Sequence, residues 1–174
     1  MVGQVGKVIG FGGLVALAMG VFAGAARADS GWTPYFSEEQ PSGQFCPGGE
    51  RVEATSCTGS YCDNIALYCG TLPTGVSITQ YAFMSSYFSD ETGARECLFS
   101  GAWGAITGMK CTNSYCDNMY IECGRTTGTL SGCAWTGWVS EEAGTNAFVD
   151  KTARAAQYSD DYCDSMRYLV CNHS

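Results

Sequence analysis

The chain has 174 residues, and 17 acidic against 9 basic side chains give it a formal net charge of −8 at pH 7. A field of this sign repels phosphate backbones and anionic lipids, which argues against nucleic acid as a partner but leaves cationic partners and metal ions open. Eleven cysteines beside a single histidine, with no Cys-x-x-Cys pair, favour a disulfide framework over a zinc site or thiol chemistry.

The first 28 residues predict a secretory signal peptide. Lys7 supplies a positive charge, an apolar segment covers 8–26, and Ala26-Arg27-Ala28 ends in small residues suited to cleavage. An uncleaved membrane anchor is the alternative, because about 20 apolar residues span a bilayer, but the glycines within the segment argue against it. We therefore expect a secreted or periplasmic protein with no membrane span after cleavage.

The tripeptide Tyr-Cys-Asp then occurs three times, at 61–63, 115–117 and 162–164, and a second cysteine follows each copy. A period of about 50 residues indicates tandem copies of one supersecondary unit. We predict a single domain, residues 29–174, whose three repeats are 29–80, 81–130 and 131–174.

Hydrophobic alternation predicts strands on both sides of each repeated tripeptide. Segments 51–57 and 106–111 are expected to precede short turns, and segments 65–69 and 119–123 to follow them. One such unit cannot bury its apolar face alone, so closure of the three units is favoured. The prediction is an all-β, disulfide-rich, pseudo-threefold domain, either β-prism or β-trefoil-like. An open stack of three hairpin units is the alternative.

The cysteines missing from the third repeat suggest a pairing. Repeats one and two each have four cysteines, and repeat three keeps only the last two, so we predict first-with-second pairs, Cys46–Cys57 and Cys97–Cys111. Pairing across the turn, as in Cys57–Cys62, is the rival scheme. The remaining disulfide candidates would bond within or between repeats: Cys62, Cys69, Cys116, Cys123, Cys163 and Cys171. Cys133 has no counterpart, so it is predicted to be unpaired or to link two chains into a dimer.

Aromatic residues near the start of each repeat are the best binding candidates. Such rings stack on sugars or on cationic groups, and repetition would add avidity. Alternatively the rings fill the core, with Trp32, Trp135 and Met84 in equivalent interior positions. The candidate ligand-binding residues are Trp32, Tyr35, Tyr87, Phe88, Trp103, Trp135 and Trp138.

Acidic residues offer two weaker hypotheses. The residues that follow each Tyr-Cys pair could ligate calcium, or they could form Asx-turns: Asp63, Asn64, Asp117, Asn118 and Asp164. The doublets Glu38-Glu39, Asp90-Glu91 and Glu141-Glu142 could serve glycoside hydrolysis or lie in solvated turns. Catalysis is disfavoured because every candidate carboxylate recurs in each repeat, and because His173 is expected in a disordered tail.

We therefore expect an exported, non-catalytic binding module that recognises a glycan or another cell-surface ligand. A secreted inhibitor or toxin-like effector is the alternative, and it would present the segment 99–110 with Trp103 at its tip. A glycoside hydrolase ranks third. No cofactor other than calcium is anticipated.

Overall fold

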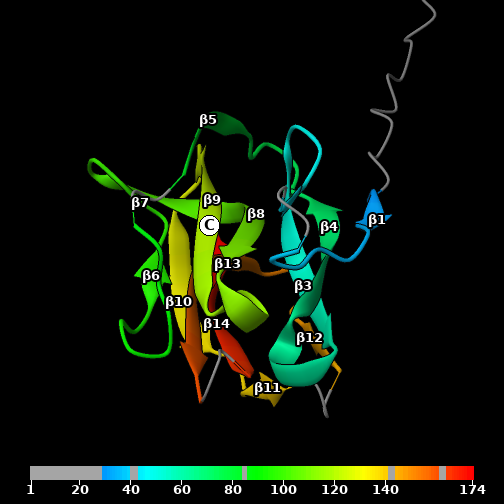
Figure 1. The fold of residues 1–174 in the computed structure, drawn as a ribbon. Helices are drawn as coiled ribbons and strands as arrows, with labels where there is room; N and C mark the ends of the chain where they lie inside the picture. Colours follow the sequence, from blue (N-terminus) through cyan, green and yellow to red (C-terminus); the bar gives the residue numbers. More distant parts are fainter. Residues whose placement is uncertain (1–28, 40–42, 84–85, 141–143, 161–163) are drawn as a thin grey trace, which may run out of the picture.

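A computed structural model of the chain describes residues 29–39, 43–83, 86–140, 144–160 and 164–174. The predicted signal peptide, Met84 and Cys163 lie outside these ranges. The described residues confirm an all-β fold of three antiparallel sheets, shown in Figure 1. The first sheet has the order β1 (Gly31–Trp32), β4 (Asn64–Thr71), β3 (Glu50–Thr58), β12 (Thr145–Ala147).

The other two sheets have five strands each. The second has the order β2 (Gln44–Phe45), β8 (Ala102–Thr112), β9 (Asn118–Thr126), β5 (Ile78–Phe83), with β7 (Leu98–Phe99) paired to β8. The third has the order β10 (Leu130–Trp135), β14 (Ser165–His173), β13 (Thr152–Ser159), β6 (Arg95–Glu96), with β11 (Val139–Ser140) paired to β14. Two short 3-10 turns, η1 (Ser60–Cys62) and η2 (Ser114–Cys116), complete the elements.

Each sheet is built on one hairpin of long strands, as the alternation predicted. The hairpins β3–β4, β8–β9 and β13–β14 share one register, because Cys57 faces Ile65, Cys111 faces Met119 and Tyr158 faces Met166. Each first strand also has a register shift at the same distance from that pair. We call residues equivalent when they hold the same register position in these three hairpins.

Short strands are exchanged between the sheets. The strand β2 lies in the first predicted repeat but pairs with β8 of the second sheet, and β6 lies in the second repeat but pairs with β13 of the third. The strand β12 lies in the third repeat and pairs with β3, so the exchange passes through all three sheets. Figure 1 shows β12 beside β3 despite their distance along the chain.

The inner strands β3, β8 and β13 pack against one another and enclose a common core. Phe36 and Phe88 are fully buried there, and the Phe88 ring lies 5.3 Å from that of Tyr158. Tyr168 is also fully buried, and its hydroxyl lies 3.4 Å from the Met166 sulfur. Burial raises the pKa of Tyr168 to about 12, so this hydroxyl stays protonated at any ordinary pH.

The disulfides correct the pairing favoured from the sequence. Cys57 bonds Cys62 and Cys111 bonds Cys116, which is the rival scheme across the turn. The pairing is feasible because η1 and η2 each place a Tyr and a Cys at positive φ, between 55° and 59°, which brings the Cα atoms of each pair to 5.0 and 4.9 Å. Cys46–Cys69 and Cys97–Cys123 then link the ends of two exchanged strands, β2 and β6, to their own repeats.

Cys133 was predicted to be unpaired or intermolecular, and this was wrong. It bonds Cys171 between the adjacent strands β10 and β14, with a Cα separation of 4.1 Å. A dimer linked through Cys133 therefore has no support. The five disulfides use ten of the eleven cysteines, and Cys163 lies outside the described residues.

Aromatic residues take the positions of two missing cysteines in the third repeat. Tyr158 is equivalent to Cys57 and Cys111. Phe148 follows β12 and donates its backbone N–H to Glu53, just as Cys46 follows β2 and donates to Thr107. Both rings are buried, so hydrophobic contact replaces covalent linkage at these positions.

His173 does not lie in a disordered tail. It is the last residue of β14, where it pairs with Leu130 of β10. The last strand is held down because β10 covers its edge, which the sequence analysis did not anticipate.

Candidate functional site

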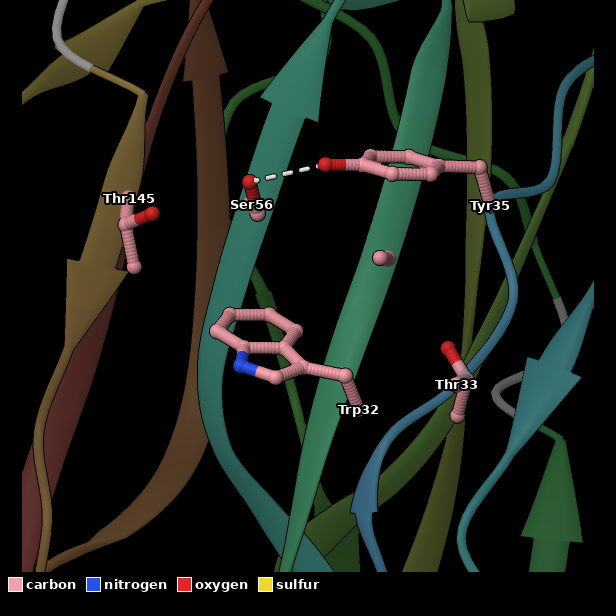
Figure 2. A pocket seen from close by; sticks show the side chains of 6 residues that line it. Trp32, Thr33, Tyr35, Ser56 and Thr145 are labelled. Carbon is pink, nitrogen blue, oxygen red and sulfur yellow. Dashed lines mark hydrogen bonds between the residues drawn. The ribbon is translucent and has the colours of Figure 1, made fainter.

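A pocket of about 300 Å³ opens on the outer face of the first sheet. Figure 2 shows the rings of Trp32 and Tyr35 on two sides of it, with the Ser56 hydroxyl reaching toward Tyr35. The lining residues come from β1, the segment after it, β3, β4 and β12: Trp32, Thr33, Tyr35, Ser56, Ala66 and Thr145.

The aromatic walls are positioned by backbone pairing to β4. Trp32 faces Tyr68, and the two rings meet edge to face at 5.5 Å. Two residues after Thr33, whose N–H donates to the Leu67 carbonyl, the chain reaches Tyr35, and Phe36 then bridges Ile65. Since Phe36 is fully buried, alternation turns Tyr35 outward.

The two rings are about half exposed, as are several other large side chains of this protein. Trp32 is 48% and Tyr35 44% exposed, while Ala66 between them is buried. The Tyr35 hydroxyl lies 3.4 Å from Ser56 Oγ, which donates to the Gly144 carbonyl at 3.1 Å. None of the described lining residues carries a charge. The described lining thus combines two aromatic faces with a few hydroxyl groups.

The third sheet has the same aromatic pair but fills the space between them. Trp135 and Trp138 are equivalent to Trp32 and Tyr35, and Arg167 is equivalent to Ala66. The Arg167 guanidinium carbon lies 4.8 Å from the Trp135 ring centroid and 4.3 Å from that of Trp138. Its nitrogens donate to Gln157, the residue equivalent to Ser56, at 3.0 and 2.7 Å.

The second sheet is filled in another way. Phe83 and Tyr87 are its equivalents of Trp32 and Tyr35, and Tyr120 stands where Ala66 stands in the first sheet. The Lys110 ammonium, equivalent to Ser56, lies 4.9 Å from the Phe83 centroid and 4.7 Å from that of Tyr120. The three sheets are therefore not three copies of one open site.

The structure sorts the predicted aromatic candidates. Trp32, Tyr35, Tyr87, Trp135 and Trp138 are exposed, so the alternative in which Trp32 and Trp135 fill the interior is wrong.

Phe88, by contrast, is fully buried and belongs to the core, because it is the inward neighbour of Tyr87 on an alternating segment. The Phe83 side chain, which the sequence analysis omitted, takes the place expected of an aromatic in the second sheet.

Trp103 does not lie at a loop tip. It is the second residue of β8 and pairs with Leu98, so the turn falls at Ser100 and Gly101. The Arg154 guanidinium carbon lies 3.3 Å from the Trp103 ring centroid, and a guanidinium nitrogen donates to a Glu96 carboxylate oxygen at 2.9 Å. Most of the segment 99–110 is a paired strand of the second sheet.

The Asp-Asn residues lie where the turns η1 and η2 meet. The ring centroids of Tyr61 and Tyr115 lie 5.3 Å apart, and the Cys116 sulfur lies 3.4 Å from the Asp63 carbonyl oxygen. Burial, followed by the nearby charge of Glu38, raises the pKa of Asp63. Within the described ranges, no group of three or more His, Cys, Asp or Glu side chains could hold a metal ion.

The sequence analysis missed Ser56, Ala66 and Arg167. Their signal was present in the repeat alignment, because the second residue after each Asp-Asn or Asp-Ser pair reads Ala66, Tyr120 and Arg167. Ala66 leaves space because its side chain is small, and it has no reactive or hydrogen-bonding group. Its role can be recognised only by comparison with the larger residues at the equivalent positions.

Comparisons with protein-family models, curated proteins and solved structures found no match. Five disulfides are typical of an oxidising, extracytoplasmic environment. Across the described residues, the chain forms no helix with the length and apolar character needed to cross a membrane.

Proposed function

We propose that this protein is a secreted or periplasmic, non-catalytic binding module that holds a ligand group between Trp32 and Tyr35. The observation that carries the proposal is the open pocket with two exposed aromatic walls and hydroxyl groups on its floor and rim. Exposed aromatic side chains of this size, gathered around a concavity, are typical of recognition surfaces.

The proposed scaffold is a pseudo-threefold, β-prism-like body. The shared register of the three hairpins and the exchange of β2, β6 and β12 support this arrangement. The disulfides would keep the pocket rigid outside the cytoplasm, so that little ordering entropy is lost when a ligand binds.

A glycan is one class of ligand that suits such a surface. A sugar ring can stack on Trp32 or Tyr35, and its hydroxyls can bond Ser56 Oγ, Thr33 or Thr145. Multivalent binding through three equivalent sites is no longer part of the proposal, because Tyr120 and Arg167 occupy the space in the other two sheets.

A glycan array with purified protein tests the proposal. We expect binding to be lost in Trp32→Ala and retained in Tyr87→Ala, which removes an equally exposed ring from the second sheet. Circular dichroism checks that both variants fold. Binding that survives Trp32→Ala, or that disappears equally in both variants, would show that the pocket is not the site.

A further inference from the structure

We infer that the pocket of the first sheet receives the guanidinium group of an arginine side chain that belongs to a partner protein. This inference rests on the proposed function, since it names the chemical class of the ligand at the same site. It is drawn from what the other two sheets place against the equivalent aromatic rings.

The third sheet shows how this arrangement holds a guanidinium. Arg167 lies over both Trp135 and Trp138, at 4.8 and 4.3 Å from the ring centroids, and donates two hydrogen bonds to Gln157. Cation–π attraction operates within about 6 Å of an aromatic centroid, and a guanidinium also stacks on the ring plane. The chain therefore contains its own example of an occupied site.

The second sheet repeats the preference with a different cation. Lys110 sits over Phe83, the equivalent of Trp32 and Trp135, although Tyr120 takes the space that Arg167 takes in the third sheet. Two of three equivalent rings are thus covered by a cation from the same sheet. The remaining ring, Trp32, faces the pocket.

The first sheet lacks both of the residues that fill the space elsewhere. Ala66 replaces the arginine and Ser56 replaces the glutamine, which leaves the pocket of about 300 Å³. A guanidinium has five N–H donors and needs acceptors. Ser56 Oγ, the Tyr35 hydroxyl and Thr145 can supply them around the aromatic walls.

Charge favours a basic partner over a neutral one. The protein has a formal net charge of −8, and the described lining of the pocket has no lysine or arginine to repel a cation. Long-range attraction would raise the rate of encounter, while the uncharged pocket selects a weakly hydrated, planar cation. Lysine is more strongly hydrated and cannot stack, so it should bind less well.

The test uses N-acetyl-arginine-N-methylamide and its citrulline analogue, which has nearly the same shape but no charge. Titration is followed by NMR of the indole N–H groups in the full folded protein. We expect saturable shifts of the Trp32 signal with a dissociation constant on the order of millimolar and about 10-fold weaker binding of citrulline. In Trp32→Ala the indole signal is gone, so binding is read from the backbone N–H signals of the pocket strands, and we expect it to be lost.

Two variants reproduce or reverse the difference between the sheets. The double variant Ser56→Gln, Ala66→Arg should fill the first pocket from within and abolish arginine binding while the protein stays folded. Conversely, Arg167→Ala should open a second site between Trp135 and Trp138, so that two arginine ligands bind per chain instead of one.

The outcomes separate this inference from the proposed function. Glycan binding that depends on Trp32, with no response to arginine, would overturn the inference and leave the binding module in place. Arginine binding only to Arg167→Ala would also overturn it, because the first pocket would then not accept the group. If neither arginine binding nor glycan binding depends on Trp32, both proposals fail.

Discussion

The first and third sheets hold the same backbone register but differ in what occupies it. On the outer face, Ala66 in one corresponds to Arg167 in the other, and Trp32 to Trp135. On the inner face, the disulfide-bonded Cys57 corresponds to the aromatic Tyr158. At these positions the first sheet is cross-linked inside and open outside, whereas the third sheet is packed with an aromatic ring inside and filled by an arginine outside.

This difference shows that the three hairpins share the backbone register, whereas the side chains at equivalent positions differ. Both solutions on the inner face place a buried side chain at the same register position. Both solutions on the outer face keep two aromatic rings at the same spacing from β4 or β14. A repeat can therefore open or fill the space between its outer aromatic rings without a change in its backbone register.

The inner face offers the largest effect. Tyr158→Ala removes a fully buried ring that packs on Phe88, and we expect it to lower the free energy of unfolding by about 3–5 kcal/mol. Urea denaturation followed by tryptophan fluorescence measures the change. A loss below about 1 kcal/mol would show that the third sheet does not rely on this ring.

Removing the equivalent inner-face group of the first sheet should lower the free energy of unfolding by less. Replacing Cys57 and Cys62 together by alanine removes a disulfide with a sequence separation of 5, and such a short loop contributes about 2 kcal/mol. The same urea experiment under non-reducing conditions gives the value. A larger loss than that of Tyr158→Ala would reverse the order proposed for the two inner faces.

Substitutions on the outer face should lower the free energy of unfolding by less, and by different amounts in the two sheets. Arg167→Ala removes contacts with two tryptophans and two hydrogen bonds, so a loss of about 1–2 kcal/mol is expected.

Trp32→Ala should change stability by less than that amount, because the ring is half exposed and faces an open pocket. Thermal unfolding of the two variants compares them. Equal losses would mean that Trp32 is held for packing rather than for a ligand.

The strand ends give the smallest effect, through pH. Burial, together with the nearby charge of Arg51, lowers the pKa of His173 at the end of β14, whereas the first sheet has Thr71 at the end of β4. The folded state therefore favours the neutral ring. This contribution is complete above the ordinary pKa of about 6.5 and is lost as pH falls toward the lower folded value.

In His173→Gln, the melting temperature should fall less between pH 7 and pH 5 than it does in the wild-type protein. Identical pH profiles would show that His173 does not contribute. Arg51→Met provides a control for the nearby charge, although it also breaks a buried ion pair with Glu53 and will itself destabilise the protein.

The hairpins were predictable because their signals are local. Alternation around Ile65 and Met119, and turn residues such as Gly59, specify strand–turn–strand without reference to the rest of the chain. Position near the start of a repeat did not by itself separate an exposed ring such as Trp32 from the buried Phe88.

The disulfides were not predictable in the same way. The joint absence of two cysteines from the third repeat suggested one lost bridge, but Phe148 and Tyr158 each replaced one member of two different bridges. Cys133 then supplied a new partner for Cys171 from a neighbouring strand. That bond joins two strands that lie side by side in one sheet but far apart in the sequence, so no local pattern connects them.

The exchange of β12 also constrains how this protein reaches its native state. The outer edge of β3 is paired only after residues 145–147 have been synthesised and docked, although β3 itself ends at Thr58. Until then its edge exposes unpaired backbone groups that can capture another chain. Assembly of the first sheet thus depends on a strand from the third repeat. A chain truncated before that strand would leave an exposed sheet edge that can pair with other chains, rather than form a smaller stable domain.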